Sequence, residues 1–171
     1  EQFPDQLGIE GLRARGAARR GDSGVAPAFR QLPCDQHRHR NHGEADQAKA
    51  LVESVVAETG RLDFLINNAG GSPASDAATA SPRFVEAILK LNLVGPLYMA
   101  QAAYPHLKAA GGGSIINIAS VSGARPSPGT AIYGAAKAGL LNLTQSLAQE
   151  WGADQIRVNA IIAGLMTTEN A

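Results

Sequence analysis

Three short apolar runs, separated by longer segments of helical character, constrain the fold of this chain more than any other feature. The runs occupy residues 62–66, 114–119 and 156–162, and the intervening segments include 82–109 and 133–151. Short apolar runs bounded by turn residues are typical of strands buried on both faces. Strands that alternate with long helices form parallel sheets through right-handed crossovers. The sequence therefore predicts an α/β fold with a doubly wound parallel sheet.

Local signals indicate where the helices begin and end. Apolar residues at helical spacing predict an amphipathic helix over 44–60. Ser81 is a favourable N-cap and Pro82 suits the first helical position, whereas three glycines starting at Gly111 end the second helix. Pro96 lies inside that helix and is expected to disturb it locally.

The composition excludes several classes of protein. The chain has 171 residues, a formal net charge of zero and 44% hydrophobic residues, values that suit one globular domain without a nucleic-acid or membrane partner. Cys34 is the only cysteine, so an internal disulfide is impossible. No apolar run is long enough to span a membrane, and the start does not read as a signal peptide. We expect a single cytoplasmic domain.

The first 43 residues differ from the rest of the chain. They hold seven of the fifteen basic residues, and no apolar period of 2 or 3.6 residues extends through them. We expect irregular structure at 1–43 and one folded domain at 44–171. The His-Arg run at 36–42 has two functional interpretations, a metal site or a nucleic-acid contact. A solvated loop is favoured, because the run itself contains no Cys or Asp, and we expect no metal.

Polar and small residues follow each predicted strand. Residues 67–70 read Asn-Asn-Ala-Gly after the first strand, Ser120 follows the second, and Gly164 follows the third. In open parallel sheets, ligands bind beyond the carboxyl ends of the strands. The three strand ends are therefore expected to meet at one cleft. Residues 122–130 are rich in Gly, Pro and Ser and are expected to form a loop.

Tyr133 and Lys137 form the clearest chemical pair in the sequence. They lie four residues apart at the start of a predicted helix, so their side chains project from one face. An ammonium beside a phenol favours the phenolate form, which makes the tyrosine a candidate general acid or base. Ser120 ends the preceding strand, where its hydroxyl could hydrogen-bond a substrate oxygen. Tyr-x-x-x-Lys alone arises often by chance, so the assignment depends on the residues around it.

Those surroundings contain a series of motifs. Asn-Asn-Ala-Gly at 67–70 precedes Asn92, and Ser120 lies thirteen residues before the tyrosine of Tyr-Gly-Ala-Ala-Lys at 133–137. In order and spacing, the segment 46–169 resembles the short-chain dehydrogenase/reductase family. The resemblance implies a Rossmann-like fold and hydride transfer between NAD or NADP and a small alcohol or carbonyl substrate. The nicotinamide ring of the cofactor carries the hydride.

The resemblance also implies roles for individual residues. Tyr133 is the acid/base, Ser120 orients and polarises the substrate oxygen, and Lys137 promotes ionisation of the phenol and bonds the nicotinamide ribose. Asn92 holds a water in the proton relay; its second interpretation is a residue that caps or kinks its helix, since Asn is a poor helix former. The positions that match cofactor contacts are Asp35 near the adenine, Asn68, Ala69 and Gly70 through their backbone, Tyr133, Lys137, and Met166 and Thr168 at the nicotinamide.

Two parts of the family pattern do not match. The glycine-rich turn that approaches the cofactor pyrophosphate is not recognisable, because Gly8 and Gly11 have neither its spacing nor a preceding strand. We hypothesise that residues 1–43 are translated in a wrong frame or come from a defective gene model. The family continues past the segment at Gly164 into a lid and a further strand, so we expect a truncated domain. The sequence distinguishes neither NAD from NADP nor one substrate from another.

Three alternatives stay open. A catalytically inactive fragment without functional dinucleotide binding is supported by the missing glycine-rich turn. A sugar-nucleotide epimerase or dehydratase shares Tyr-x-x-x-Lys, but residues 67–70 and the spacing from Ser120 to Tyr133 favour the dehydrogenase. A nucleic-acid-binding module depends on the basic first segment alone. We also expect a homo-oligomer, a dimer or tetramer, in which the leucine stripe at 140–151 is core or subunit contact.

Overall fold

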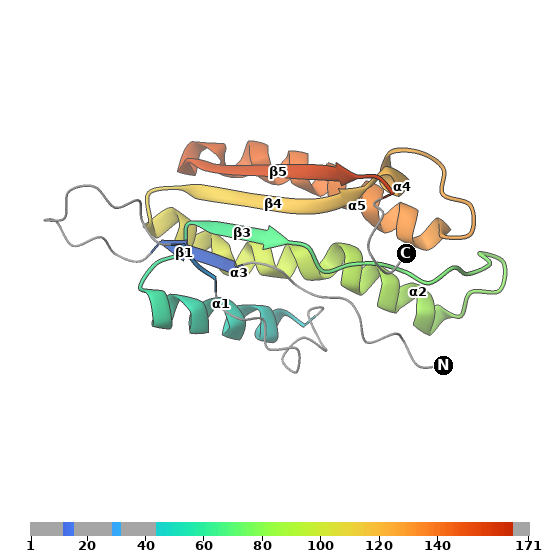
Figure 1. The fold of residues 1–171 in the computed structure, drawn as a ribbon, viewed down its shortest axis with the longest axis horizontal. Coiled ribbons are helices and arrows are strands. Elements are labelled where there is room, and N and C mark those ends of the chain that lie inside the picture. Colours follow the sequence, from blue (N-terminus) through green and yellow to red (C-terminus); the bar gives the residue numbers. More distant parts are fainter. Residues whose placement is uncertain (1–11, 16–28, 32–43, 166–171) are drawn as a thin grey trace, which may run out of the picture.

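The described part of the chain forms one five-stranded sheet with helices packed on it. The computed structural model describes residues 12–15, 29–31 and 44–165. The strands are β1 Leu12–Arg15, β2 Phe29–Gln31, β3 Phe64–Asn67, β4 Gly113–Ser120 and β5 Ile156–Ala163. Across the sheet they run in the order β2-β1-β3-β4-β5 (Figure 1). β3, β4 and β5 are parallel, whereas β1 is antiparallel to both of its neighbours.

The parallel part of the sheet agrees with the sequence prediction, and its antiparallel margin does not. All three predicted strands are present within two residues of the expected bounds, and the parallel α/β arrangement is confirmed. The expectation of irregular structure at 1–43 missed β1 and β2. Strands of four and three residues are too short to produce a visible apolar period.

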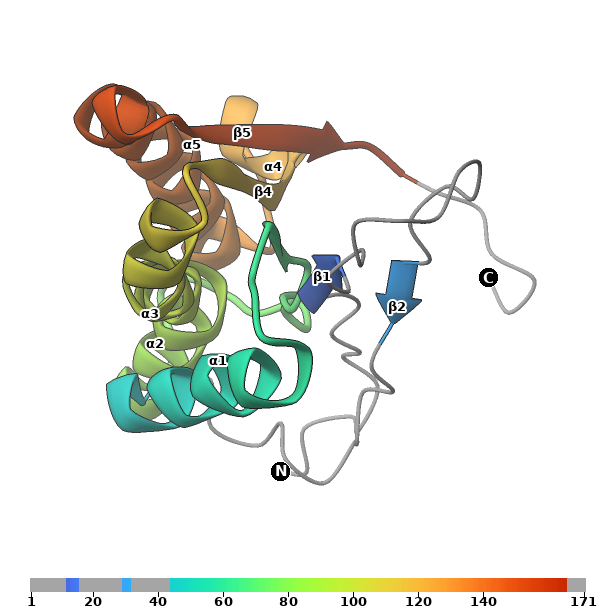
Figure 2. The same ribbon diagram turned by 90° about the vertical axis from the view of Figure 1, so that its left-hand side faces the viewer.

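One layer of helices packs on the sheet. The helices are α1 Ala45–Thr59, α2 Pro82–Leu89, α3 Gly95–Ala109, α4 Val121–Ala124 and α5 Ala131–Trp151, with a π-helical turn η2 at Lys90–Val94 and a 3-10 turn η3 at Gly152–Asp154. Figure 2 shows α1, α3 and α5 on the same face of the sheet. No described helix of more than one turn covers the other face, so these residues provide one of the two helical layers of a doubly wound fold.

The signals at the helix ends act as predicted. Ser81 Oγ accepts a hydrogen bond from Phe84 N at 3.2 Å, and Pro82 occupies the first position of α2. The disturbance expected at Pro96 takes the form of η2, because proline has no N–H to donate to the carbonyl one helical turn earlier. The loop expected at 122–130 is replaced at its start by the single turn α4.

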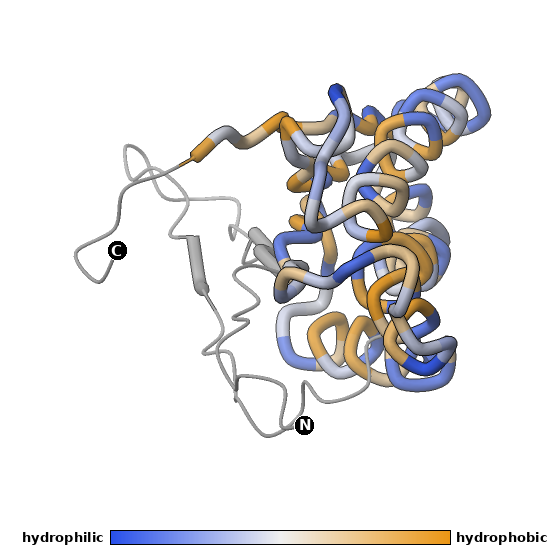
Figure 3. Tube along the Cα trace, turned by 90° about the vertical axis from the view of Figure 1, so that its right-hand side faces the viewer, coloured by the Kyte–Doolittle hydropathy of each residue, from blue (hydrophilic) through white to orange (hydrophobic). Residues whose placement is uncertain are grey.

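The hydrophobic core lies between this helical layer and the sheet. Leu140 and Leu147 of α5 are 0% and 6% exposed, and Trp151 packs against the core cluster that contains Leu147, so the leucine stripe belongs to the core. The far end of β5 is different: Figure 3 shows it as hydrophobic, and Ile161 and Ile162 are 53% and 50% exposed.

Among the described helices, none combines the length and the apolar character needed to cross a membrane.

Candidate active site

The carboxyl edge of the parallel strands collects the predicted site residues. Asn67 is the last residue of β3, Ser120 is the last residue of β4, and Gly164 directly follows β5. The first turns of α5 lie at the same edge, because the Lys137 ammonium donates a hydrogen bond to the carbonyl of Ile118 near the end of β4. The three strand ends and the Tyr133–Lys137 helix therefore occupy one region of the molecule.

Lys137 is a buried cation with no carboxylate partner in the described part of the chain. The residue is 3% exposed, and its Nζ lies 2.7 Å from the Ile118 carbonyl oxygen and 5.7 Å from the centre of the Tyr133 ring. Burial lowers the pKa of Lys137 from 10.5 to about 8, since removal from water penalises the charged form. An ammonium has three donors, so the described residues leave two of them to a ligand.

Asn92 holds the loop that follows β3. The residue is 0% exposed and lies in η2. Its Oδ1 accepts a hydrogen bond from Gly71 N at 2.8 Å. Its Nδ2 donates to the carbonyl oxygens of Gly71 at 2.9 Å and Ile88 at 3.0 Å. Both donors of the side chain are therefore used, and both backbone groups of Gly71 are bound.

Gly70 is required by close packing. A Cβ atom at this position would lie 2.7 Å from Asn92 Oδ1 and 2.9 Å from Lys137 Nζ, so any larger residue would displace one of these groups. The loop backbone thus passes directly beside the buried amide and the buried ammonium. Asn68 and Ala69 border a cavity of about 30 Å³, enough for about one water molecule.

Ser120 is held against α5 through α4. Its Oγ accepts a hydrogen bond from Ser122 N at 3.1 Å and caps α4. The backbones of α4 and α5 then pack directly on each other. A Cβ on Gly123 would lie 2.5 Å from the carbonyl carbon of Lys137, and one on Gly134 would lie 2.9 Å from the Ser122 carbonyl oxygen. Such close contact leaves little freedom for Ser120 relative to α5.

A buried polar chain, which the sequence analysis missed, joins the segments that carry the site. Asn67 Nδ2 donates to Asn117 Oδ1 at 2.8 Å and to the Pro96 carbonyl oxygen at 3.3 Å. Asn117 Nδ2 donates to Thr144 Oγ1 at 2.9 Å, and that hydroxyl donates to the Leu140 carbonyl oxygen at 2.7 Å. This buried polar chain of hydrogen bonds connects β3, β4, α3 and α5. The available signal was an Asn in the centre of an apolar strand, since a buried amide must find partners.

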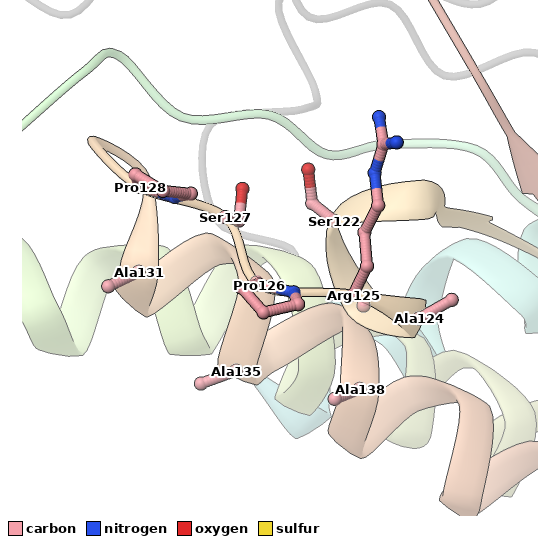
Figure 4. A pocket seen from close by; sticks show the side chains of 11 residues that line it. Ser122, Ala124, Arg125, Pro126, Ser127, Pro128, Ala131, Ala135 and Ala138 are labelled. Atoms are coloured by element: carbon pink, nitrogen blue, oxygen red, sulfur yellow. The ribbon is translucent and has the colours of Figure 1, made fainter.

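An open groove of about 520 Å³ lies beside the candidate site (Figure 4). It is bordered by α4, the loop that follows it, and small residues of α5 between Ala131 and Ala138. These α5 residues are spaced by three and four and share one helix face, whereas Tyr133 and Lys137 share another. The groove therefore does not contain the Tyr133–Lys137 pair.

Some predicted positions fall outside the described residues. They are Asp35, Met166 and Thr168 of the expected cofactor contacts, and the His-Arg run at 36–42. Within residues 12–15, 29–31 and 44–165, no group of three or more His, Cys, Asp or Glu side chains is placed to hold a metal ion. The candidate site is formed by Asn92, Ser120, Tyr133, Lys137 and the loop Asn68, Ala69 and Gly70.

Comparisons with known proteins relate this arrangement to a family. The short chain dehydrogenase family model matches residues 37–171. The 7alpha-hydroxysteroid dehydrogenase of Bacteroides fragilis is 37% identical over 131 residues, which cover 75% of this chain and 51% of that protein. The 2-dehydro-3-deoxy-D-gluconate 5-dehydrogenase of Escherichia coli is 40% identical over 126 residues, which cover 73% of this chain and 50% of that protein.

Solved structures show the same fold. A crystal structure of an NAD+-bound xylitol dehydrogenase superposes with a TM-score of 0.73 and 29% sequence identity, over 76% of this chain and 50% of that chain. The chain thus spans about half the length of the relatives that it matches. The family match includes the whole carboxyl edge described above, from β3 to the end of β5. This chain belongs to the short-chain dehydrogenase family.

Proposed function

We propose that this chain carries the proton-transfer groups of an NAD- or NADP-dependent oxidoreductase that interconverts an alcohol and a carbonyl compound. The observation that supports this most is the buried Lys137 ammonium, 5.7 Å from the Tyr133 ring. A tyrosine and a buried ammonium this close together form a plausible acid–base pair. The relatives reported above are a steroid, a sugar-acid and a xylitol dehydrogenase, which agrees with this reaction class.

Each side chain has a separate task in the proposed reaction. When bound, the nicotinamide supplies the hydride acceptor or donor. The Tyr133 phenolate accepts the hydroxyl proton of an alcohol during oxidation and returns it during reduction. Ser120 Oγ already accepts from Ser122 N, so its own O–H is free to donate to the substrate oxygen. Asn92 positions the loop through Gly71.

The residues that would hold the cofactor are Lys137 and the loop backbone at Asn68, Ala69 and Gly70. The fit is supported by the two Lys137 donors that lack a described acceptor, since ribose hydroxyls accept such bonds. The predicted relay water at Asn92 stays a prediction. Because both Nδ2 donors are used, such a water would have to bond to Oδ1 or to the backbone.

A second candidate function is an inactive fragment without functional dinucleotide binding. One observation favours it: the strand beside β3 is the antiparallel β1. A Rossmann sheet places a parallel strand there, which leads into the helix that binds the pyrophosphate. An antiparallel strand ends at the opposite edge of the sheet, away from the site.

Cofactor titration separates the two candidates. The purified chain is titrated with NADH and with NADPH by fluorescence, and turnover of a panel of small alcohols is then measured. Saturable binding with turnover supports the oxidoreductase, and no binding at millimolar cofactor supports the inactive fragment. The same titration distinguishes NAD from NADP.

The expected homo-oligomer and the cytoplasmic location stay predictions. Light scattering of the purified chain measures its oligomeric state. A monomer at all concentrations would contradict the dimer or tetramer expected from the family.

A further inference from the structure

The segment that carries the candidate catalytic residues contains cations but no carboxylate. No Asp or Glu occurs between Glu86 and Glu150. That interval contains η2, β4, α4 and most of α5, and therefore all four candidate catalytic residues. The cations in the same interval are Lys90, Lys108, Arg125 and Lys137. A region lined by one sign of charge attracts ligands of the opposite sign.

Two of these cations are neutralised and two are not. Lys90 pairs with Glu44, and Lys108 pairs with Asp154 at 2.9 Å. Arg125 and Lys137 have no carboxylate partner among residues 12–15, 29–31 and 44–165. Lys137 already has a place in the proposed reaction, but Arg125 does not.

Arg125 is attached closely to Ser120. The turn that separates them, α4, begins at the Ser120 cap and has Arg125 at its other end, where the Arg125 N–H donates to the Val121 carbonyl. A helix of four residues spans about 6 Å. Arg125 is exposed, so its guanidinium is accessible to a ligand that binds beside Ser120 and α4.

The position of α4 favours a substrate over a cofactor phosphate as the ligand. α4 contacts β4, β5 and α5. The loop expected to approach the cofactor, at Asn68, Ala69 and Gly70, follows β3 on the other side of β4. Arg125 therefore belongs to the β5 side of Ser120, and the cofactor loop belongs to the β3 side.

Two hydroxyls accompany the guanidinium. Figure 4 shows the side chains of Ser122, Arg125 and Ser127 pointing to one side, away from Ala131, Ala135 and Ala138. Ser127 Oγ lies 2.6 Å from Thr130 Oγ1, a contact that restrains its orientation. A guanidinium binds a carboxylate through two parallel hydrogen bonds, and neighbouring hydroxyls can add further donors.

We infer that Arg125, together with the Ser122 and Ser127 hydroxyls, binds a carboxylate of the substrate. The substrate class is then a hydroxy acid or an oxo acid whose reacting carbon lies near Ser120. This inference rests on the proposed oxidoreductase function and adds the substrate class to it. Arg125 is a specificity-determining residue in this scheme, and proton transfer stays with Tyr133.

A binding titration tests the inference without requiring turnover. The 15N-labelled chain is titrated with 3-hydroxybutyrate and with its neutral amide, 3-hydroxybutyramide, and NMR signals of the arginine Nε–Hε groups are followed. The Arg125 signal, identified by its loss in Arg125→Lys, should shift saturably with the acid and not with the amide. Arg125→Gln should raise the dissociation constant for the acid about 10- to 100-fold, measured from backbone amide shifts.

Arg157→Gln is the matched control. Arg157 is also exposed, but it lies at the amino end of β5, the opposite end from the site, so affinity for the acid should not change. Equal binding of acid and amide would overturn the inference, as would equal weakening by Arg125→Gln and Arg157→Gln. Inorganic phosphate serves as a competing probe. If phosphate displaces 3-hydroxybutyrate at a concentration lower than that of the acid, the site prefers phosphate groups, and the carboxylate assignment is overturned.

The outcome also separates this inference from the proposed function. Binding of the acid through Arg125 without hydride transfer to NAD+ or NADP+ would refute the oxidoreductase and leave the carboxylate site in place. Oxidation of neutral alcohols with no preference for acids, unchanged in Arg125→Gln, would support the oxidoreductase and refute the carboxylate site.

Discussion

Charged groups at the amino edge of the parallel sheet form ion pairs, whereas the most buried cation at the carboxyl edge has no carboxylate partner in the described part of the chain. At the amino edge, Arg61 pairs with Asp63 at 2.8 Å. Nearby, Asp154 accepts hydrogen bonds from Tyr104 at 2.6 Å and from Lys108 at 2.9 Å. At the carboxyl edge, the Lys137 ammonium is 3% exposed and faces a phenol ring and a carbonyl, with no described carboxylate beside it.

This difference supports the carboxyl edge as the ligand-binding edge. Paired charges are already satisfied and serve to hold helix ends and strand starts in place. A buried cation without a counter-charge costs stability, and such groups cluster where a protein uses them for binding or catalysis. The paired charges therefore stabilise the amino edge, and the unpaired buried cation supports the site proposed at the carboxyl edge.

The largest expected effect is on turnover in Tyr133→Phe. Removal of the phenol hydroxyl takes away the proposed acid/base, so kcat should fall about 10²- to 10⁴-fold while cofactor binding is retained. Steady-state kinetics and the NADH titration measure the two properties. Tyr98→Phe, on the partly buried face of α3, is the matched control and should leave turnover unchanged. Unchanged kcat in Tyr133→Phe would refute the assigned role.

The next effect is the pH dependence of stability that Lys137 causes. The pKa of Lys137 is lowered from 10.5 to about 8 by burial. Between these values the unfolded chain holds a proton that the folded chain has lost, so the free energy of unfolding should rise with pH, by up to about 3 kcal/mol. Lys137→Met should lack this rise. Denaturant unfolding of both chains across the window measures it, and parallel curves would contradict the buried charged amine.

A smaller effect is expected when the buried polar chain is broken. Thr144→Val leaves Asn117 Nδ2 without its acceptor, which should cost about 1–3 kcal/mol of unfolding free energy. Thr144→Ser keeps the hydroxyl and should recover most of the loss. Ser146→Ala is a matched control, because Ser146 makes the same kind of bond to the Asn142 carbonyl at an exposed position. Equal urea midpoints for Thr144→Val and Ser146→Ala would show that the buried polar chain contributes nothing to the free energy of unfolding.

The smallest effect is expected at the amino edge, in Asp154→Asn. The hydrogen bond from Tyr104 and the bond from Lys108 lower the pKa of Asp154, so its stabilising contribution is present near neutral pH and is lost as pH falls through the folded-state pKa. Lys108 is exposed and Asp154 is only partly buried, so the thermal midpoint should shift only slightly and less at high salt. A loss as large as that of Thr144→Val would contradict the small contribution expected of this pair.

Much of the fold could be predicted from local sequence signals. The three parallel strands, the caps at Ser81 and Pro82 and the disturbance before α3 were all expected, because apolar spacing and capping chemistry act over a few residues. The short strands β1 and β2 and the single turn α4 were missed, since elements of three or four residues contain less than one clear period.

The sequence by itself determined the family, the order of the site residues along the chain and the thirteen-residue spacing from Ser120 to Tyr133. Only the tertiary structure decided that Asn92 binds Gly71, that Gly70 has no room for a side chain, and that Asn117 reaches Thr144. It also decided which cations are paired and which are not. The physical reason is distance along the chain. The hydrogen bonds of Asn117 join residues 27 and 50 positions apart, and no local pattern reports such partners.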